Sequence, residues 1–167
     1  MSILGYMVGD ATKPERNGIK KHVIIHVCNN IGAWGGGFTG ALDKKWPLVG
    51  DAYAQWFKDW LGYTGQPFLL GQVQFAASGH KDLKVANMIA QNNVRSAANP
   101  IPISYPALRI CLETVALSLR SQPSVAIDMP RIGCGLAGGE WDKIAVMIYD
   151  VLVLEAHIPV FVYDLPK

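Results

Sequence analysis

The sequence has few cysteines, little net charge and no long apolar run, and each shortage excludes a class of protein. Its 167 residues include three cysteines, an odd number typical of free thiols in a reducing compartment. Fifteen basic and thirteen acidic side chains give a net charge of +2 without blocks of like charge, so no strong nucleic-acid surface is expected. No uncharged stretch approaches the ~20 residues of a membrane span, and the N-terminus lacks a signal-peptide pattern. We therefore expect a cytoplasmic protein with no membrane partner.

The chain also lacks the side-chain sets of common metal and nucleotide motifs. Its four histidines and three cysteines do not have the spacing of a metal site, so we expect no metal and no cofactor. A Gly-x-Gly-x-x-Gly pattern at residues 133–138 formally matches the dinucleotide fingerprint, but no βαβ unit with an acidic residue at its end follows it. Neither glycine-rich segment continues into Gly-Lys-Ser/Thr, which excludes a Walker-type phosphate loop.

What the sequence does contain is an apolar strand that leads directly into glycines. Residues 22–28 (HVIIHVC) form a short run rich in branched side chains, and four glycines follow between positions 32 and 37. From Phe38 the segment FTGALDKKW predicts a helix. A strand, a bare backbone and a helix N-terminus together present N–H groups to an anion. The alternative is a tight connector of an ordinary α/β protein, although four glycines exceed what a turn requires.

The order of the predicted elements indicates an α/β fold. We expect strands over residues 2–8, 22–28, 71–76, 83–90, 124–129 and 157–163, and helices over 38–46, 49–61, 104–120 and 141–155. Two neighbouring strands with no helix between them make the sheet mixed, and helices should cover both of its faces. The predicted fold class is therefore a three-layer α/β/α domain with a six-stranded sheet, as a single unit over residues 1–167. The polar segment 91–102 is the best candidate for a mobile loop.

A second glycine-rich turn follows a second strand. Residues 130–139 (PRIGCGLAGG) come directly after the strand at 124–129 and precede the last helix. Two such turns, each opening a helix at the end of a strand, would set two backbone anion sites opposite each other. That arrangement suits a diphosphate.

Three stretches of the sequence are similar to a macrodomain, the ADP-ribose-binding fold. They are Gly9-Asp10-Ala11 after the first strand, CNNIGAWGGGF at residues 28–38 and MPRIGCGLAGGEW at residues 129–141. The last stretch, with the closing VYDL, resembles the branch that contains ADP-ribose 1''-phosphate phosphatases and terminal ADP-ribose protein glycohydrolases. The resemblance spans nearly the whole chain. It implies ADP-ribose or ADP-ribose 1''-phosphate as the ligand, with ADP-ribosylated macromolecules as a further class of partner.

The resemblance also implies a role for each matching residue. Asp10, with its neighbour Ala11, would bind the adenine amino group, and Tyr163 would lie near the adenine. The two glycine turns would hold the diphosphate and the distal ribose. The ligand-binding residues expected there are Asn29, Gly35, Gly36, Gly37 and Phe38 in the first turn, and Arg131, Gly133, Cys134, Gly135 and Leu136 in the second.

Two positions depart from the glycohydrolase members of this branch. Those members use a lysine at the end of the fourth strand and an aspartate just after the GCGL segment, where this chain has Gln91 and Ala137. Neither residue can form a Schiff base or act as a general acid or base, so the lysine mechanism is not expected. The phosphatase members instead resemble an HxCN…GxWGGG pattern, which residues 26–29 and 32–37 match. Their proposed catalytic histidine aligns with His26.

Three of the residues named above also have a structural interpretation that involves no ligand. Strand alternation puts His26 on the same face as Cys28, so it could be a core histidine with a backbone partner rather than a general base or nucleophile. Asp10 could form an Asx turn at the end of its strand, and Trp34 could simply pack over the loop.

The resemblance implies that the protein binds ADP-ribose and is a metal-independent phosphatase that hydrolyses ADP-ribose 1''-phosphate to ADP-ribose and phosphate. The alternatives are a non-catalytic ADP-ribose-binding module and an ADP-ribosyl hydrolase that works on protein or nucleic acid without the lysine. His26 favours an enzyme, whereas the absence of a second evident acid counts against one.

Overall fold

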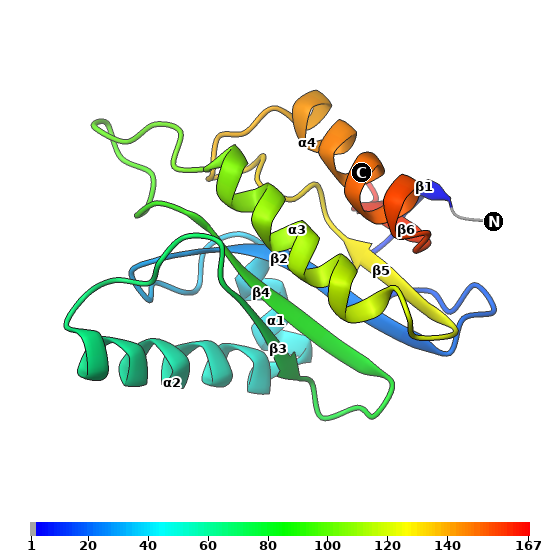
Figure 1. Cartoon of the computed structure of the whole chain (residues 1–167), viewed down its shortest axis with the longest axis horizontal. Helices are drawn as coiled ribbons and strands as arrows, with labels where there is room; N and C mark the ends of the chain where they lie inside the picture. The colour runs from blue at the N-terminus through cyan, green and yellow to red at the C-terminus, as the bar shows by residue number, and fades with distance from the viewer. Residues whose placement is uncertain (1–2) are drawn as a thin grey trace.

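Six strands form one mixed sheet in the computed structural model, which describes residues 3–167 (Figure 1). The strands are β1 (Leu4–Val8), β2 (Lys21–Asn29), β3 (Val73–Ala77), β4 (Leu83–Gln91), β5 (Val125–Met129) and β6 (Val160–Asp164). They lie in the order β1-β6-β5-β2-β4-β3. All neighbouring strands are parallel except β3 and β4, which confirms the predicted mixed sheet.

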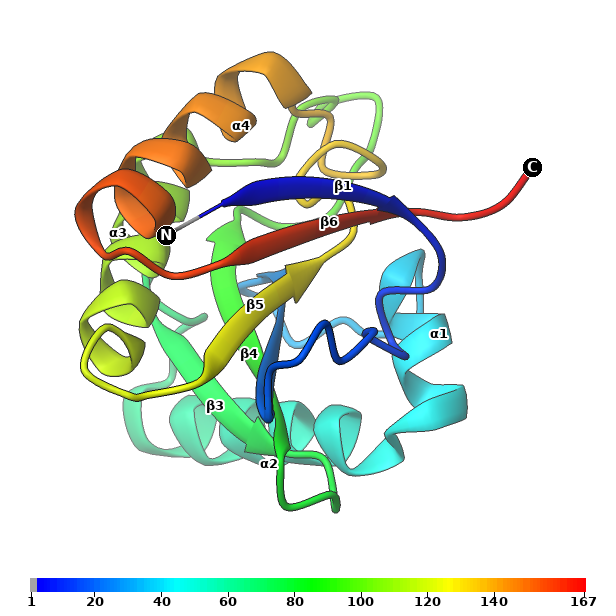
Figure 2. The same ribbon diagram turned by 90° about the vertical axis from the view of Figure 1, so that its right-hand side faces the viewer.

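Four α-helices cover the two faces of the sheet. They are α1 (Phe38–Lys45), α2 (Pro47–Thr64), α3 (Tyr105–Leu119) and α4 (Trp141–Ile148), and α4 continues into a π-helix, η1 (Tyr149–Glu155). Figure 2 shows α3 and α4 on one side of the sheet and α1 and α2 on the other, which confirms the predicted three layers. None of the helices within residues 3–167 has the length and apolar character needed to cross a membrane.

Strand β2 lies at the centre and divides its side chains between the two layers. Val23 and Ile25 pack in the core formed with α3 and α4, whereas Ile24 packs with Leu42 and Val49 of α1 and α2. Burial on both faces explains why this strand has a nearly continuous apolar sequence. By the same alternation, His26 belongs to the α1/α2 side.

Several predicted element ends are wrong, and turn geometry explains the differences. The last strand does not start at His157, which has a φ of 57°. The N–H groups of His157 and Ile158 donate to Val153 O and Leu152 O (3.1 and 2.9 Å) and close the last helical turn, so they are not available to a strand. Strand β3 starts two residues late because Gly71 has a φ of 100°.

The second helix and the first strand also differ from the prediction at their ends. Pro47 does not merely stop α1: it opens α2, where a proline is tolerated because the first N–H groups of a helix have no partner within it. Gly65 ends α2 in the left-handed conformation. Strand β1 begins at Leu4, and residue 2 of the predicted strand lies outside the described residues.

The parallel strands bring four connecting segments to one edge of the sheet. Strands β1, β6, β5, β2 and β4 are parallel in turn, so their carboxyl ends lie at the same edge. Ligands of open α/β sheets bind outside these ends. The segment after β1, the two glycine turns after β2 and β5 and the segment after β4 therefore meet there.

Candidate functional site

Two adjoining cavities open at this edge of the sheet. The first, which we call the glycine cavity, has a volume of about 430 Å³ and lies between the two glycine turns. The second, the Asp10 cavity, has about 650 Å³ and lies between the segment after β1, helix α1 and the end of β6. Gly37, Phe38 and Pro130 line both cavities, so the two join into one elongated cleft.

All but one of the predicted site residues line this cleft. The glycine cavity is lined by His26, Asn29, Gly35, Gly36, Gly37, Phe38, Arg131, Gly133, Gly135 and Leu136. The Asp10 cavity is lined by Asp10, Ala11 and Tyr163, besides the shared Gly37 and Phe38. The exception is Cys134, whose thiol turns back to donate to Ile132 O (3.5 Å) and packs against the core.

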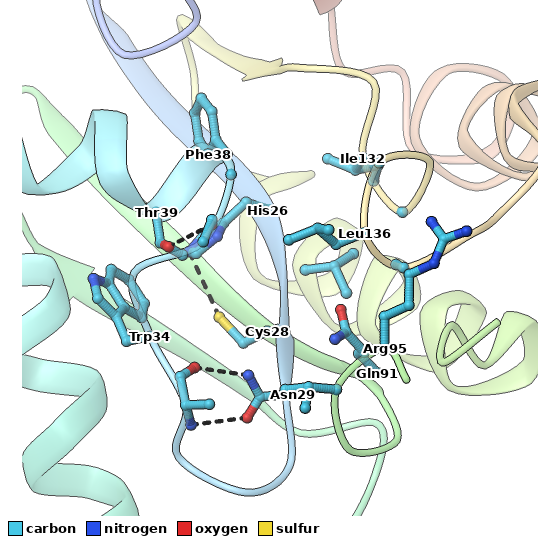
Figure 3. A pocket seen from close by; sticks show the side chains of 18 of the residues that line it. His26, Cys28, Asn29, Trp34, Phe38, Thr39, Gln91, Arg95, Ile132 and Leu136 are labelled. Atoms are coloured by element: carbon cyan, nitrogen blue, oxygen red, sulfur yellow. Dashed lines mark hydrogen bonds between the residues drawn. The ribbon is translucent and has the colours of Figure 1, made fainter. Parts of the chain in front are cut away.

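Asn29 builds the first glycine turn rather than pointing freely into the cleft. Its Oδ1 accepts hydrogen bonds from Ile31 N and Ala33 N (3.1 and 3.0 Å) and from the Tyr53 hydroxyl (3.1 Å). Its Nδ2 donates to Ala33 O (2.7 Å), and Figure 3 shows the two bonds to this residue. The side chain therefore fixes the path of the turn at its first residue.

The glycines that follow leave backbone N–H groups without partners among the described residues. Gly35 and Gly37 have φ values of 120° and 60°, a region that side-chain-bearing residues rarely adopt. The Gly35 N–H donates to Thr39 Oγ1 (2.9 Å), so this group is already used. The N–H groups of Gly36 and Gly37 have no partner among residues 3–167, and no side chain caps α1 at Gly37. Two donors therefore remain at the positive end of α1.

The second glycine turn closes on itself and meets the first across the cavity. The N–H groups of Gly138 and Gly139 donate to Gly135 O and Gly133 O (3.1 and 2.7 Å). A Cβ added to Gly36 would lie 3.1 Å from Leu136 Cδ1, so the two turns nearly touch there. A Cβ added to Gly135 would meet nothing within 4 Å. The space beside Gly135 is therefore open to a ligand.

His26 is buried at the wall of the glycine cavity. Its side chain is 2% exposed, and its ring packs edge-on against Trp34 with centroids 5.6 Å apart. Nε2 lies 2.5 Å from Asn87 Oδ1 and 3.7 Å from Cys28 Sγ, a contact drawn in Figure 3. The partner is thus a side chain of β4 and not the backbone partner that a core histidine was expected to have.

The tautomer of His26 follows from its neighbour. Asn87 Nδ2 donates to Gln74 Oε1 (2.9 Å), which leaves Asn87 Oδ1 as an acceptor and puts the imidazole proton on Nε2. Nδ1 then carries a lone pair, and it has no hydrogen-bond partner within the described residues. Burial lowers the pKa of His26 to about 4, so the ring is neutral at pH 7.

Of the two arginines that line the glycine cavity, one is paired with a carboxylate and the other has no such partner among the described residues. No carboxylate from residues 3–167 lines the cavity. Arg131 donates from Nε and Nη2 to the two carboxylate oxygens of Asp164 (2.8 and 2.9 Å), and its guanidinium lies over the rings of Tyr6 and Trp141. Arg95 lines the same cavity without an ion pair or side-chain hydrogen bond to the described residues. Sequence reasoning missed Arg95, because no motif marks it within the polar loop.

At the other end of the cleft, Asp10 forms an Asx turn, which the sequence pattern predicted as the alternative to ligand binding. Its Oδ1 accepts from the backbone N and the hydroxyl of Thr12 (2.9 and 2.7 Å). Oδ2 has no hydrogen bond to any residue from 3 to 167. The carboxylate therefore holds the turn with one oxygen, and the other has no partner among the described residues.

Tyr163 belongs to a buried hydrogen-bond network that the sequence did not reveal. Its hydroxyl donates to Asp128 Oδ1 (3.2 Å) and accepts from Glu15 N (3.0 Å). His22 Nδ1 lies 2.6 Å from Asp128 Oδ2, and its Nε2 donates to Ile19 O (3.2 Å). Burial lowers the pKa of His22, but the bond to Asp128 and its charge outweigh burial, and the net pKa is raised. The network anchors the loop over residues 11–20 beside the Asp10 cavity.

Residues 3–167 contain no group of three or more histidine, cysteine, aspartate or glutamate side chains that could hold a metal ion. One neutral imidazole and two arginines line the glycine cavity, whereas the Asp10 carboxylate and the lysines Lys13, Lys44 and Lys45 line the Asp10 cavity.

Comparison with known proteins identifies the family. No family model matches the sequence. A macrodomain protein from Streptomyces coelicolor is 36% identical, with a TM-score of 0.79 over 97% of this chain and 99% of that one. This chain belongs to the macrodomain family. The macrodomain is also similar to a protein of unknown function from Bacteroides thetaiotaomicron, at 43% identity and a TM-score of 0.85 over 98% of both chains.

A relative at lower identity has a named activity. The ADP-ribose 1''-phosphate phosphatase of Candida albicans is 23% identical over 166 residues, which cover 93% of this macrodomain and 99% of the phosphatase. The resemblance predicted from the glycine turns is confirmed at the level of the family.

Proposed function

We propose that this macrodomain, as a single unit over residues 1–167, binds ADP-ribose and hydrolyses ADP-ribose 1''-phosphate to ADP-ribose and phosphate. The observation that carries this proposal is the order of groups along the cleft. Asp10 and Tyr163 line one cavity, the unpaired N–H groups of Gly36 and Gly37 lie at the junction, and His26 lines the other. The ligand has the same order: adenine, diphosphate, distal ribose and its phosphate. The full-length similarity to the Candida albicans phosphatase supports the same substrate.

Binding in this proposal uses groups that have no partner within residues 3–167. Asp10 Oδ2 would accept a hydrogen bond from the adenine amino group, while Oδ1 keeps the turn in place. The N–H groups of Gly36 and Gly37, at the positive end of α1, would donate to the diphosphate. The second glycine turn closes the opposite wall, where Gly135 leaves room for the ligand.

Hydrolysis in this proposal is carried by His26 and water. The phosphorus–oxygen bond to the distal ribose breaks, and ADP-ribose leaves with that oxygen and gains a proton. A water oxygen ends on the phosphorus, either directly with Nδ1 accepting its proton or by hydrolysing a phosphoryl group first transferred to Nδ1. The lowered pKa keeps the Nδ1 lone pair unprotonated at pH 7, which both routes require.

The test is phosphate release from ADP-ribose 1''-phosphate by the purified protein, with calorimetric titration of ADP-ribose alongside it. Release of phosphate in the presence of a metal chelator supports the proposal. ADP-ribose binding without phosphate release supports a non-catalytic binding module instead, a candidate favoured by the lack of a carboxylate in the glycine cavity. The same samples, given ADP-ribosylated protein or nucleic acid, test the third candidate, an ADP-ribosyl hydrolase.

The proposal also includes the cellular compartment of the protein. All three cysteines are free thiols, two of them buried. We place the protein in the cytoplasm for this reason.

A further inference from the structure

The loop between β4 and α3 is tied to the first glycine turn by asparagine side chains. Asn30 of that turn donates from Nδ2 to Asn92 Oδ1 (3.2 Å) and accepts at Oδ1 from Asn93 N (2.8 Å). Within the loop, Asn99 Nδ2 donates to Asn92 O and Val94 O (2.9 and 3.1 Å). These bonds fix the backbone on both sides of Arg95.

The same loop also packs against the second glycine turn. Ile103 N donates to Ala137 O (3.0 Å). A Cβ added to Gly138 would lie 2.9 Å from Pro100 O, so the two backbones approach closely. The loop backbone therefore has a defined position relative to both walls of the glycine cavity, and this position fixes where the Arg95 side chain starts.

Arg95 is the cation that this loop brings to the cavity. Figure 3 shows Arg95 and Gln91 on the opposite side of the view from Trp34, and all three line the glycine cavity. The other arginine of the cavity, Arg131, is already paired with Asp164. Among the described residues that line the cavity, Arg95 is thus the one cation without a carboxylate partner.

The position of Arg95 along the cleft indicates which anion it meets. The residues shared by the two cavities mark the middle of the cleft, where Gly37 offers its N–H to the diphosphate. Arg95 lines only the glycine cavity, so it lies away from Asp10 and beyond the middle. A phosphate monoester on the distal ribose adds a charge of about −1.5 to −2 at that end. A guanidinium binds such a group with two parallel hydrogen bonds.

We infer that Arg95 forms a subsite for the phosphate on the anomeric oxygen of the distal ribose and selects ADP-ribose 1''-phosphate over ADP-ribose. The inference rests on the proposed function, since it assigns the group that recognises its substrate. Gln91 supports the subsite through its Nε2, which donates to Asn93 O (3.1 Å) and so helps to hold the loop.

The experiment compares Arg95→Gln with Arg120→Gln, a matched change of charge at the C-cap of α3, outside both cavities. Arg95→Gln should raise the KM for ADP-ribose 1''-phosphate about 10-fold or more, because a charge-assisted pair is lost. Its Kd for ADP-ribose should stay within about threefold of the unmodified protein, since that ligand has no group at the subsite. Arg95→Lys should recover part of the KM, and Arg120→Gln should change neither value.

Two results overturn the inference: an unchanged KM in Arg95→Gln, or an equal loss of affinity for both ligands, which would place Arg95 at the diphosphate. The inference is separable from the catalytic proposal. If the unmodified protein releases no phosphate, calorimetry with ADP-ribose 1''-phosphate and ADP-ribose replaces the kinetics. A preference for the phosphorylated ligand that Arg95→Gln abolishes then supports the subsite, and the absence of any preference overturns it.

Discussion

At the scale of the residue, His26 combines full burial with an unpaired ring nitrogen, which is uncommon for a merely structural histidine. Its Nδ1 is the buried side-chain atom without a partner in residues 3–167. If this atom acts at phosphorus, His26→Ala should keep ADP-ribose affinity within about threefold and lower kcat by at least about 100-fold. Calorimetry and phosphate release on the same preparation check both values. Full activity in His26→Ala would exclude the mechanism.

The pKa of the same imidazole makes stability depend on pH. The folded pKa is about 4 against 6.5 for a model histidine, so the unfolded chain takes up a proton before the folded one does. The contribution of His26 is complete above about pH 6.5 and is lost as the pH falls towards 4. It amounts to about 3 kcal/mol, at about 1.4 kcal/mol for each pKa unit.

Urea denaturation at pH 7, 5.5 and 4 measures this loss by comparison with His26→Gln, which cannot take up the proton. The unfolding free energy of the unmodified protein should fall more steeply than that of the variant. His22 has a raised pKa, so its contribution runs in the opposite direction and is lost as the pH rises. The contribution of His22 is the same in the unmodified protein and in His26→Gln, so it cancels when their unfolding free energies are subtracted. Parallel curves would mean that His26 is not titrated by unfolding.

Asp10 holds its turn through Oδ1, and under the proposed function Oδ2 binds the adenine, so two substitutions test the assignment. Asp10→Ala should weaken ADP-ribose binding by about 1–3 kcal/mol, because the adenine amino group loses its acceptor. Asp10→Asn can keep the turn to Thr12 through Oδ1 but presents an amide N–H group to the adenine amine, and it should lose a similar amount. Calorimetry with ADP-ribose and its inosine counterpart tests the assignment. Equal affinity of the unmodified protein for both ligands would refute it.

At the scale of the element, the two glycine turns differ in what a side chain would meet. Gly135 has a permitted backbone and open space around an added Cβ, so Gly135→Val should fold normally and place its methyl groups in the cleft. ADP-ribose binding should fall at least about 10-fold with the melting temperature nearly unchanged. Gly62→Val on α2, also with open space, is the control and should leave binding intact. Unchanged binding in Gly135→Val would put the ligand elsewhere.

The sequence predicted those parts of the fold and the site that local patterns carry. The apolar run of β2, the glycine turns and the helix predicted over 104–120, observed as α3, all lie in short segments with their own signal. The His26–Asn87 contact joins residues that are paired only by the register of β2 against β4, 61 positions apart. Arg95 reaches the cavity through asparagine bonds to the first turn. Such contacts depend on how distant segments dock, which no local pattern encodes.

At the scale of the whole molecule, the Asp10 cavity depends on a network that joins three strands. His22 comes from β2, Asp128 from β5 and Tyr163 from β6, and together they hold the loop over residues 11–20 through Ile19 O and Glu15 N. Burial raises the pKa of Asp128, and the hydrogen bonds from His22 and Tyr163 with the charge of His22 offset part of that rise. The network thus joins the sheet to the loop behind Asp10 and holds this wall of the Asp10 cavity in place.

Tyr163→Phe removes the hydroxyl from this network and leaves the ring in place. The change should cost about 1–2 kcal/mol of unfolding free energy, since the Glu15 N–H and one oxygen of Asp128 lose a partner. It should also raise amide hydrogen exchange over residues 11–20 and weaken ADP-ribose binding a few-fold, while the pairing of Arg131 with Asp164 is unaffected. Tyr63→Phe, at a side chain that is 93% exposed, is the matched control and should change none of these values. If Tyr163→Phe has the same unfolding free energy as the unmodified protein and the same amide hydrogen exchange over residues 11–20, the network does not order this end of the cleft.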